Sequence, residues 1–396
     1  MRTIIYTGKG GVGKTSLAAA TALASAAHGH RTLVMSTDSA HSLGDSLQVS
    51  LGRDPTKVTD RLWGQEIDVL AEMERHWAEI SNYLTALLQS QGVEEITAKE
   101  VVVIPGMELI AALLLLERYE REKSWDVAIV DTAPTADTLR LLSFPDAVQW
   151  YFDRFFKLEK RMMKVARPTV GRLMRTPLPS DRFFESLEDL YLRFRRVRNM
   201  LSDPDRTSVR LVLNPERMVI TETQRAYTYL CLFGLPIEML VVNRVFSDQL
   251  DGKFFEQALA EQKANLGLIE EYFGGVPMRR SPRYPHEVLG LERLRRLGTD
   301  VFDAEDPTRI FARAQPVRFF SRSGKKYVKI ELPFAGEEAL EVSSRGDTLY
   351  VKVGWYRRTL LLPYAYIGAK LGKAVFSGGS LLIEFLPSKE VPQHAS

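Results

Sequence analysis

The chain has 396 residues, of which 45% are hydrophobic and 26% are charged, and its formal net charge is only +3. This length is enough for two domains, and the composition is that of an ordinary globular protein. The small net charge gives no overall indication of nucleic-acid binding. Cys231 is the single cysteine, which excludes a disulfide framework and any metal site that needs several cysteines from one chain.

The first residues lead directly into an apolar run, so the sequence leaves no room for a signal peptide. The next apolar stretch, Leu17–Ala27, is too short and too rich in alanine to span a membrane. We therefore expect a cytoplasmic protein, and a reducing compartment is consistent with the single cysteine.

Strand-like runs alternate with helical patterns from residue 1 to about residue 300. Strands are predicted at Thr3–Thr7, Arg31–Ser36, Val101–Ile104, Asp126–Asp131, Ser208–Leu213 and Glu238–Asn243. Most of these runs are continuously apolar, as is typical of a parallel sheet buried on both faces. The sequence predicts a doubly wound α/β domain with its ligand at the carboxyl ends of the strands.

Residues 7–16, TGKGGVGKTS, follow the first strand and match the phosphate-loop pattern G-x-x-x-x-G-K-[ST]. Glycines allow backbone N–H groups to surround phosphates, and the following helix directs its positive end at the same charge. Lys14 is expected to reach the β- and γ-phosphates, and the Thr15 hydroxyl to ligate Mg²⁺. The residues expected to contact ATP here are Gly8, Lys9, Gly10, Gly11, Val12, Gly13, Lys14, Thr15 and Ser16.

Lys9 is a second lysine, which an ordinary phosphate loop does not need. The form K-G-G-x-G-K-T resembles the loop of dimerising ATPases, in which the early lysine crosses to the partner's nucleotide. The resemblance implies a homodimer in which Lys9 and Lys14 are both catalytic. A solvated loop lysine is the alternative.

Two aspartates follow predicted strands. Asp38 comes after the second strand, where it could orient the attacking water. Asp131 ends the fourth strand, where it fits the role of holding Mg²⁺ through water. Each could instead be a helix cap, but together with the loop they form a consistent nucleotide site.

Two long helical regions interrupt the α/β pattern. Apolar residues alternate at spacings of three and four in both. The stripes are Leu70, Met73, Trp77, Ile80, Leu84 and Leu87, then Phe183, Leu187, Leu190, Phe194, Val197 and Leu201. The helices could pack on each other, or part of this surface could form a groove for a hydrophobic client.

Residues 146–178 combine aromatic and methionine side chains with many bases, and 151–200 hold 13 Lys/Arg against 6 Asp/Glu. Methionine and aromatic surfaces adapt to varied apolar partners. Flanking bases suit anionic lipids or the charged ends of a membrane segment. A solvated basic face is the alternative reading.

Together these segments closely resemble the family of arsenite-pump and tail-anchored-protein targeting ATPases. The matching pieces are GKGGVGKTS, STDSAHSLGDSL, IPGMEL, DTAPTADTLRLL, LVLNPERMVITETQRAYTYL, VVNRV and PHEVLGLERL, over about residues 3–300. The resemblance implies that Asp38 positions water, that Asn243 contacts adenine and that Pro285 lies beside the base. It also implies a client-binding helical subdomain near residues 146–200.

Several departures from the family are informative. The second switch has Ala136-Asp137-Thr138, where the family usually has Gly-His-Thr. The zinc-binding C-x-x-C pair of the eukaryotic targeting factors is absent, so no zinc is expected. Arsenite transport is not expected either, because the chain has one phosphate loop and no thiol cluster.

After about residue 312 the pattern changes to short alternating strands with Gly-Asp and Gly-Gly turns, which predict a small β-sandwich. Residues 316–388 resemble the α-crystallin domain of small heat-shock proteins, although the terminal Ile-x-Ile motif is missing. A generic sandwich is the alternative. The predicted organisation is an ATPase domain at 1–312, with helical insertions at about 68–100 and 146–205, then the sandwich at 316–388.

The sequence thus predicts a cytoplasmic, homodimeric, Mg²⁺-dependent ATPase that binds and releases hydrophobic protein segments, such as tail-anchored membrane proteins. A membrane receptor or an anionic membrane surface is a further expected partner, and nucleic acid is not. Two alternatives stay open. One is an ATP-regulated holdase for misfolded proteins, and the other is a partition- or septum-type ATPase that cycles on a membrane or DNA.

Overall fold

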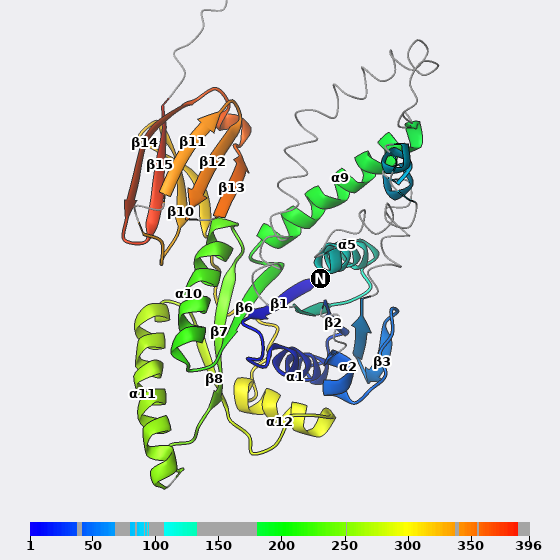
Figure 1. Ribbon diagram of the computed structural model, residues 1–396, viewed down its shortest axis with the longest axis vertical. Coiled ribbons are helices and arrows are strands. Elements are labelled where there is room, and N and C mark those ends of the chain that lie inside the picture. The colour runs from blue at the N-terminus through cyan, green and yellow to red at the C-terminus, as the bar shows by residue number, and fades with distance from the viewer. Residues whose placement is uncertain are drawn as a thin grey trace, which may run out of the picture.

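The protein folds into a mixed α/β domain followed by a smaller all-β unit (Figure 1). The computed structural model describes residues 1–37, 42–67, 80–83, 85–90, 92, 94, 107–132, 180–250, 252–336, 340–354 and 356–386. Several sequence predictions concern residues outside these ranges. They include Asp38, the strand Val101–Ile104, the second-switch residues 136–138, the aromatic, basic segment 146–178 and most of the helical insertion at about 68–100.

Within the described residues, the large sheet has eight strands in the order β3-β4-β2-β5-β1-β6-β7-β8. The strands are β1 (Arg2–Gly8), β2 (Thr32–Ser36), β3 (Thr56–Thr59), β4 (Leu62–Glu66), β5 (Val127–Asp131), β6 (Thr207–Leu213), β7 (Ile237–Val245) and β8 (Met278–Pro282). All neighbours are parallel except β3 and β4. The predicted mostly parallel, doubly wound sheet is confirmed.

Five predicted strands occur with ends shifted by one or two residues, namely β1, β2, β5, β6 and β7. The prediction missed β3, β4 and β8. Strands β3 and β8 are the two edges of the sheet, and their sequences TKVT and MRRSP are only partly buried. An edge strand has no neighbour on one side and need not be continuously apolar, so these segments lacked the signal of a central strand.

Helices cover both faces of the sheet (Figure 1). Helices α1 (Lys14–Ala27), α2 (Ser42–Leu47) and α12 (Leu291–Phe302) pack together on one side. Helix α1 is rich in alanine, which allows close approach: a Cβ added at Gly298 of α12 would lie 3.1 Å from the Ala20 carbonyl oxygen. Helix α5 (Met107–Glu122) lies on the other side with α9 (Asp181–Ser202). Helices α10 (Arg217–Leu232) and α11 (Lys253–Phe273) complete the domain.

Helix α9 carries the second predicted apolar stripe. Its start is capped by the Ser180 side chain, which accepts a hydrogen bond from the Phe183 N–H at 3.0 Å. Leu190, Phe194 and Val197 are buried in the main core. This half of the stripe is therefore a packing seam and does not form an open groove. Of the first stripe, only Ile80 and Leu87 lie within the described residues.

An ion triad with a buried Glu117–Arg193 pair fixes α9 against α5. Glu117 of α5 is 3.2 Å from Arg193 and 2.6 Å from Arg196 of α9. The Arg193 guanidinium also donates to the Leu114 carbonyl oxygen at 3.0 Å. Since both Glu117 and Arg193 are almost fully buried, this contact sets the position of α9 with hydrogen-bond geometry as well as apolar packing.

None of the described helices is both long and apolar enough to cross a membrane.

The C-terminal unit is the predicted small β-sandwich, built from a four-stranded and a three-stranded antiparallel sheet. Its strands are β9 (Val317–Arg322), β10 (Lys325–Glu331), β11 (Leu340–Arg345), β12 (Thr348–Val353), β13 (Tyr356–Leu361), β14 (Lys370–Ser377) and β15 (Ser380–Leu386). The alternating residues expected to share the interior are buried, for example Ile330, Val351 and Ile383.

The sandwich packs on the α/β domain. The Phe334 ring lies 5.2 Å from the Phe273 ring and 5.9 Å from the Tyr227 ring, so it joins an aromatic cluster on α10 and α11. Arg358 of β13 is buried and donates to the Leu232 carbonyl oxygen at the end of α10, where a cation is favourable.

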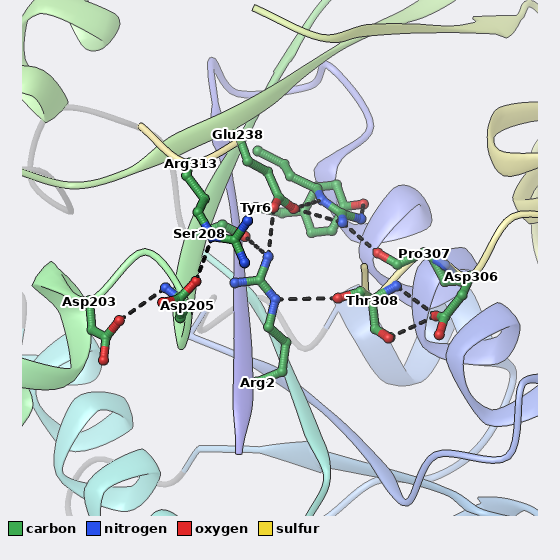
Figure 2. A network of polar contacts seen from close by, with 11 residues as sticks. Arg2, Tyr6, Asp203, Asp205, Ser208, Glu238, Asp306, Pro307, Thr308 and Arg313 are labelled. Carbon is green, nitrogen blue, oxygen red and sulfur yellow. Dashed lines mark hydrogen bonds and ion pairs between the residues drawn. The ribbon is translucent and has the colours of Figure 1, made fainter. Parts of the chain in front are cut away.

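The connection between the two units contacts side chains from β1 and β6 of the large sheet (Figure 2). Fully buried Arg210 of β6 donates to the Pro307 carbonyl oxygen, and the Arg2 Nε donates to the Thr308 carbonyl oxygen at 3.4 Å. Both arginines pair with Glu238 of β7. The connection is therefore held by the core of the α/β domain rather than running free between the two units.

Candidate nucleotide-binding site

The phosphate-loop segment connects the end of β1 to the start of α1, as predicted. Gly11 and Gly13 have φ values of 79° and 94°, in the left-handed region that favours glycine. Gly13 precedes α1 and has no side chain that could cap this 14-residue helix. The positive end of the helix is directed at the loop, which is the arrangement that favours an anion there.

Two loop glycines are required by close approach of other segments. A Cβ at Gly8 would lie 2.2 Å from the Val212 carbonyl oxygen of β6, and a Cβ at Gly13 would lie 2.3 Å from the Asn243 Nδ2. The Asn243 Nδ2 itself donates to the Val12 carbonyl oxygen at 2.7 Å. Asn243, at the end of β7, is thus held directly against the loop.

Thr15 and Asp131 lie together below the loop. The Thr15 hydroxyl donates to the Asp131 Oδ2 at 2.7 Å, and the Ser42 hydroxyl lies 3.5 Å from the Thr15 hydroxyl. Asp131 is 1% exposed and pairs in register with Tyr6 of β1 and Ser36 of β2. A carboxylate and two hydroxyls thus gather at the carboxyl edge of the central strands.

This oxygen set suits Mg²⁺, a hard cation that prefers oxygen ligands. The described residues contain no cluster of three or more His, Cys, Asp or Glu that could hold a metal ion. That is compatible with magnesium at a nucleotide, since Mg²⁺ there is usually bound by one or two protein oxygens together with phosphates and water. The chemistry of Thr15 and Asp131 therefore fits the predicted ion.

The two loop lysines have different surroundings. The Lys14 Nζ donates to the Lys9 carbonyl oxygen at 3.1 Å, and Lys14 is only 8% exposed. The Lys9 side chain is 34% exposed at the front of the loop, and its Nζ lies 3.6 Å from the Glu222 Oε2 of α10. Lys14 thus lies inside the site and Lys9 at its rim.

A pocket of about 500 Å³ opens beside the loop. It is lined by Gly13 and Ser16, by Asn243 and Arg244 at the end of β7, by the segment 282–289 after β8 and by Leu297 of α12. The structure therefore brings together Asn243 and Pro285, which are distant in sequence and which the sequence analysis linked to the base of the nucleotide. The pocket thus adjoins the loop through Gly13 and Ser16.

Sequence reasoning missed three neighbours of the predicted residues. Ser42 lies within the STDSAHS segment, in which only the aspartate was predicted to take part in the site. Glu222 lies within the segment that matched the family, but no nearby residue in the sequence indicated that it contacts Lys9. Arg244 directly follows Asn243, so only its proximity could have suggested it. Asp38 follows the end of β2 at Ser36 and lies outside the described residues.

The parallel sheet, the glycine loop and the Thr15–Asp131 contact together define the phosphate-loop class of nucleotide-hydrolysing proteins. Comparison with known families agrees. Residues 1–303 match the model of the anion-transporting ATPases, and residues 323–385 match the HSP20-like domain found in ArsA. The chain belongs to this anion-transporting ATPase family, and it is an ATPase.

Two relatives align with nearly the whole chain, and a third aligns with about three quarters of it. "Putative arsenical pump-driving ATPase 1" of Aquifex aeolicus is 39% identical over 92% of this chain and 94% of its own. A similarly named protein of Chlorobaculum tepidum is 35% identical over 100% of this chain and 98% of its own. "ATPase GET3C" of Arabidopsis thaliana is 32% identical over 74% of this chain and 80% of its own.

Proposed function

We propose that this ATPase works as a Mg²⁺-dependent homodimer that binds and releases hydrophobic protein segments, such as the membrane anchors of tail-anchored proteins. The observation that carries the proposal is the placement of Lys9. It lies at the exposed rim of the loop, where it can reach a second subunit, whereas Lys14 already occupies the interior. Lys14 can thus serve the nucleotide of its own subunit, while Lys9 is placed to serve the nucleotide of the partner.

The residues of the site have distinct proposed roles. The loop N–H groups and Lys14 would hold the phosphates, while Asn243 and Pro285 would contact the base. Thr15 and Asp131 would hold Mg²⁺, Asp131 through water, and the ion would neutralise charge on the phosphates. Asp38, just beyond β2, would orient the attacking water.

Closure of two subunits over the nucleotide would add the partner subunit's Lys9 to each site. Release of the switch segments after hydrolysis would reopen the dimer.

The client proposal is supported by the chemistry of residues 151–200, which combine a net charge of +7 with aromatic and methionine residues. Helix α9 extends from this segment into the core, and the buried contact of Glu117 with Arg193 holds it there. A conformational change on client binding at this segment would therefore be transmitted to the α/β domain through α9, which is well packed. The flanking bases also suit an anionic membrane surface or a receptor beside it.

Co-expression with a model tail-anchored substrate tests this function. The expected result is a soluble complex that persists with ATP in an Asp38→Asn variant, whose turnover should fall roughly 10²-fold or more. The control is the same substrate with its anchor replaced by a polar segment. Failure of the intact substrate to co-elute in any nucleotide state would refute the client proposal, while normal turnover of Asp38→Asn would refute the role of Asp38.

The match of residues 323–385 to an HSP20-like domain favours one second candidate, a holdase for misfolded proteins. Val375 and Leu382 face each other across β14 and β15 and are 39% and 36% exposed, so they offer apolar surface on the sandwich. If the sandwich holds clients, replacing both residues with serine should abolish protection of a denatured substrate against aggregation. Unchanged protection would exclude this patch as the client surface.

A further inference from the structure

The rim lysine of the phosphate loop is held within its own chain. The Lys9 Nζ lies 3.6 Å from the Glu222 Oε2, and the two side chains are 34% and 39% exposed. This separation is longer than the 2.7–2.9 Å typical of a strong charged hydrogen bond. The pair is therefore a close but loose contact at the protein surface, of a kind that an incoming group can exchange.

The fold explains why a carboxylate lies at this position. Strand β6 runs beside β1, and Gly8 pairs in register with Val212. Helix α10 begins four residues after β6 ends, so its first turns lie beside the loop. The helix buries Val219 and Thr223 against the core, which leaves Glu222 partly exposed next to Lys9.

We propose that Glu222 is a positioning residue that retains Lys9 in its own subunit until a nucleotide in the partner subunit takes its place. This inference rests on the proposed dimeric function. A single ammonium group on a flexible stem cannot contact Glu222 and also reach across an interface. Engagement of the second subunit therefore requires the exchange of one anion, the Glu222 carboxylate, for another, a phosphate.

The strength of the contact sets the size of the effect. Exposed ion pairs contribute little, because water and salt screen them. Each subunit of the dimer would release one such pair, and each pair is worth about two- to fivefold, so its loss in both subunits should strengthen ATP-dependent dimer formation by about 4- to 25-fold. Without ATP, Glu222 would keep Lys9 in its own subunit, so that two subunits that meet do not form the closed dimer. When ATP is bound, the charge of its phosphates would be enough to draw Lys9 away from Glu222.

The first experiment tests the pair in the absence of nucleotide. Lys9 of the full-length protein is labelled with an amine-reactive ester, and the labelled peptide is quantified by mass spectrometry. In Glu222→Gln the rate of Lys9 labelling should rise about two- to fivefold, as expected for release of a surface pair. The matched control is Glu256→Gln, which removes the same charge from an exposed position on α11. Equal Lys9 labelling in the wild type and both variants would overturn the inference.

The second experiment measures the dimer dissociation constant with Mg²⁺ and ATP in the slow Asp38→Asn background. Glu222→Gln should strengthen the dimer, Glu222→Asp should restore the original value, and Glu222→Gln should have no effect once Lys9 is methionine. A merely structural role of Glu222 would not depend on Lys9. A dimer that Glu222→Gln weakens or leaves unchanged overturns the role of Glu222 alone, whereas absence of any ATP-dependent dimer overturns the proposed function.

Discussion

The Glu238 network gives a prediction whose magnitude follows from burial. Glu238 lies 2.6 Å from Arg2 (Figure 2). It also lies 2.8 Å from Arg210, and the side chains of Glu238 and Arg210 are both fully buried. Glu238→Gln conserves the shape of the side chain but leaves two guanidinium groups with no counter-charge from this position. Removing one partner of a buried ion pair costs about 3–5 kcal/mol, because the remaining charge stays out of water.

This cost can be converted into a shift in Tm. The entropy of unfolding is about 2.1 cal/mol/K per residue, so a domain of roughly 300 residues unfolds with about 0.6 kcal/mol/K. A loss of 3–5 kcal/mol therefore lowers the Tm of the α/β domain by about 5–8 °C. Because Arg2 and Arg210 also hold Thr308 and Pro307, cleavage of the connection by a protease should become faster as well.

Glu305→Gln is the matched control. Glu305 also contacts two arginines, Arg279 at 2.6 Å and Arg309 at 3.6 Å, but its side chain is 37% exposed. Exposed pairs of this kind contribute about 0–1 kcal/mol, which corresponds to less than 2 °C in this domain. Thermal unfolding followed by circular dichroism measures both variants. Equal shifts in Tm for the two variants would refute the argument that burial decides the cost.

Three further predictions concern other parts of the molecule. Phe334→Ala removes a partly buried ring from the junction, should cost about 2 kcal/mol and should split calorimetric unfolding into two transitions; a single unchanged transition would contradict it. Asn243→Ala leaves the buried Val12 carbonyl oxygen without its 2.7 Å donor, which costs about 1–3 kcal/mol, and should weaken ATP binding in calorimetric titration. Asp306 should make stability fall at acid pH: burial raises the pKa of its carboxyl, but hydrogen bonds from His30 and Thr308 outweigh this and hold the pKa below its ordinary value. A carboxyl whose pKa is lower in the folded state contributes stability at pH values above its unfolded pKa, near 4, and this stability is lost as the pH falls through the folded pKa. The Tm should therefore decline less steeply between pH 6 and 3 in Asp306→Asn than in the wild type.

The parts of this protein whose chemistry is local could be predicted from its sequence. The phosphate loop is contiguous, and the residues Gly8 to Thr15 specify a turn, a helix start and a cation within one short segment. Most central strands were also predictable, since a strand buried on both faces is mostly apolar. The interior strand β4, with the sequence LWGQE, was the exception. The β-sandwich could be predicted from the alternation of apolar and polar residues, because residues two apart in a strand share a face.

Contacts between residues that are distant in sequence became visible only in the folded chain. Asn243 reaches the loop because β7 ends at the same edge of the sheet as β1, and a contact across more than 200 residues leaves no periodic trace in the sequence. The same holds for Glu222 beside Lys9 and for Phe334 on α10 and α11. The edge strands β3 and β8 were missed because their environment, not their composition, makes them strands. Local patterns record how each segment is buried, whereas the site and the junction depend on the order in which the chain places those segments side by side.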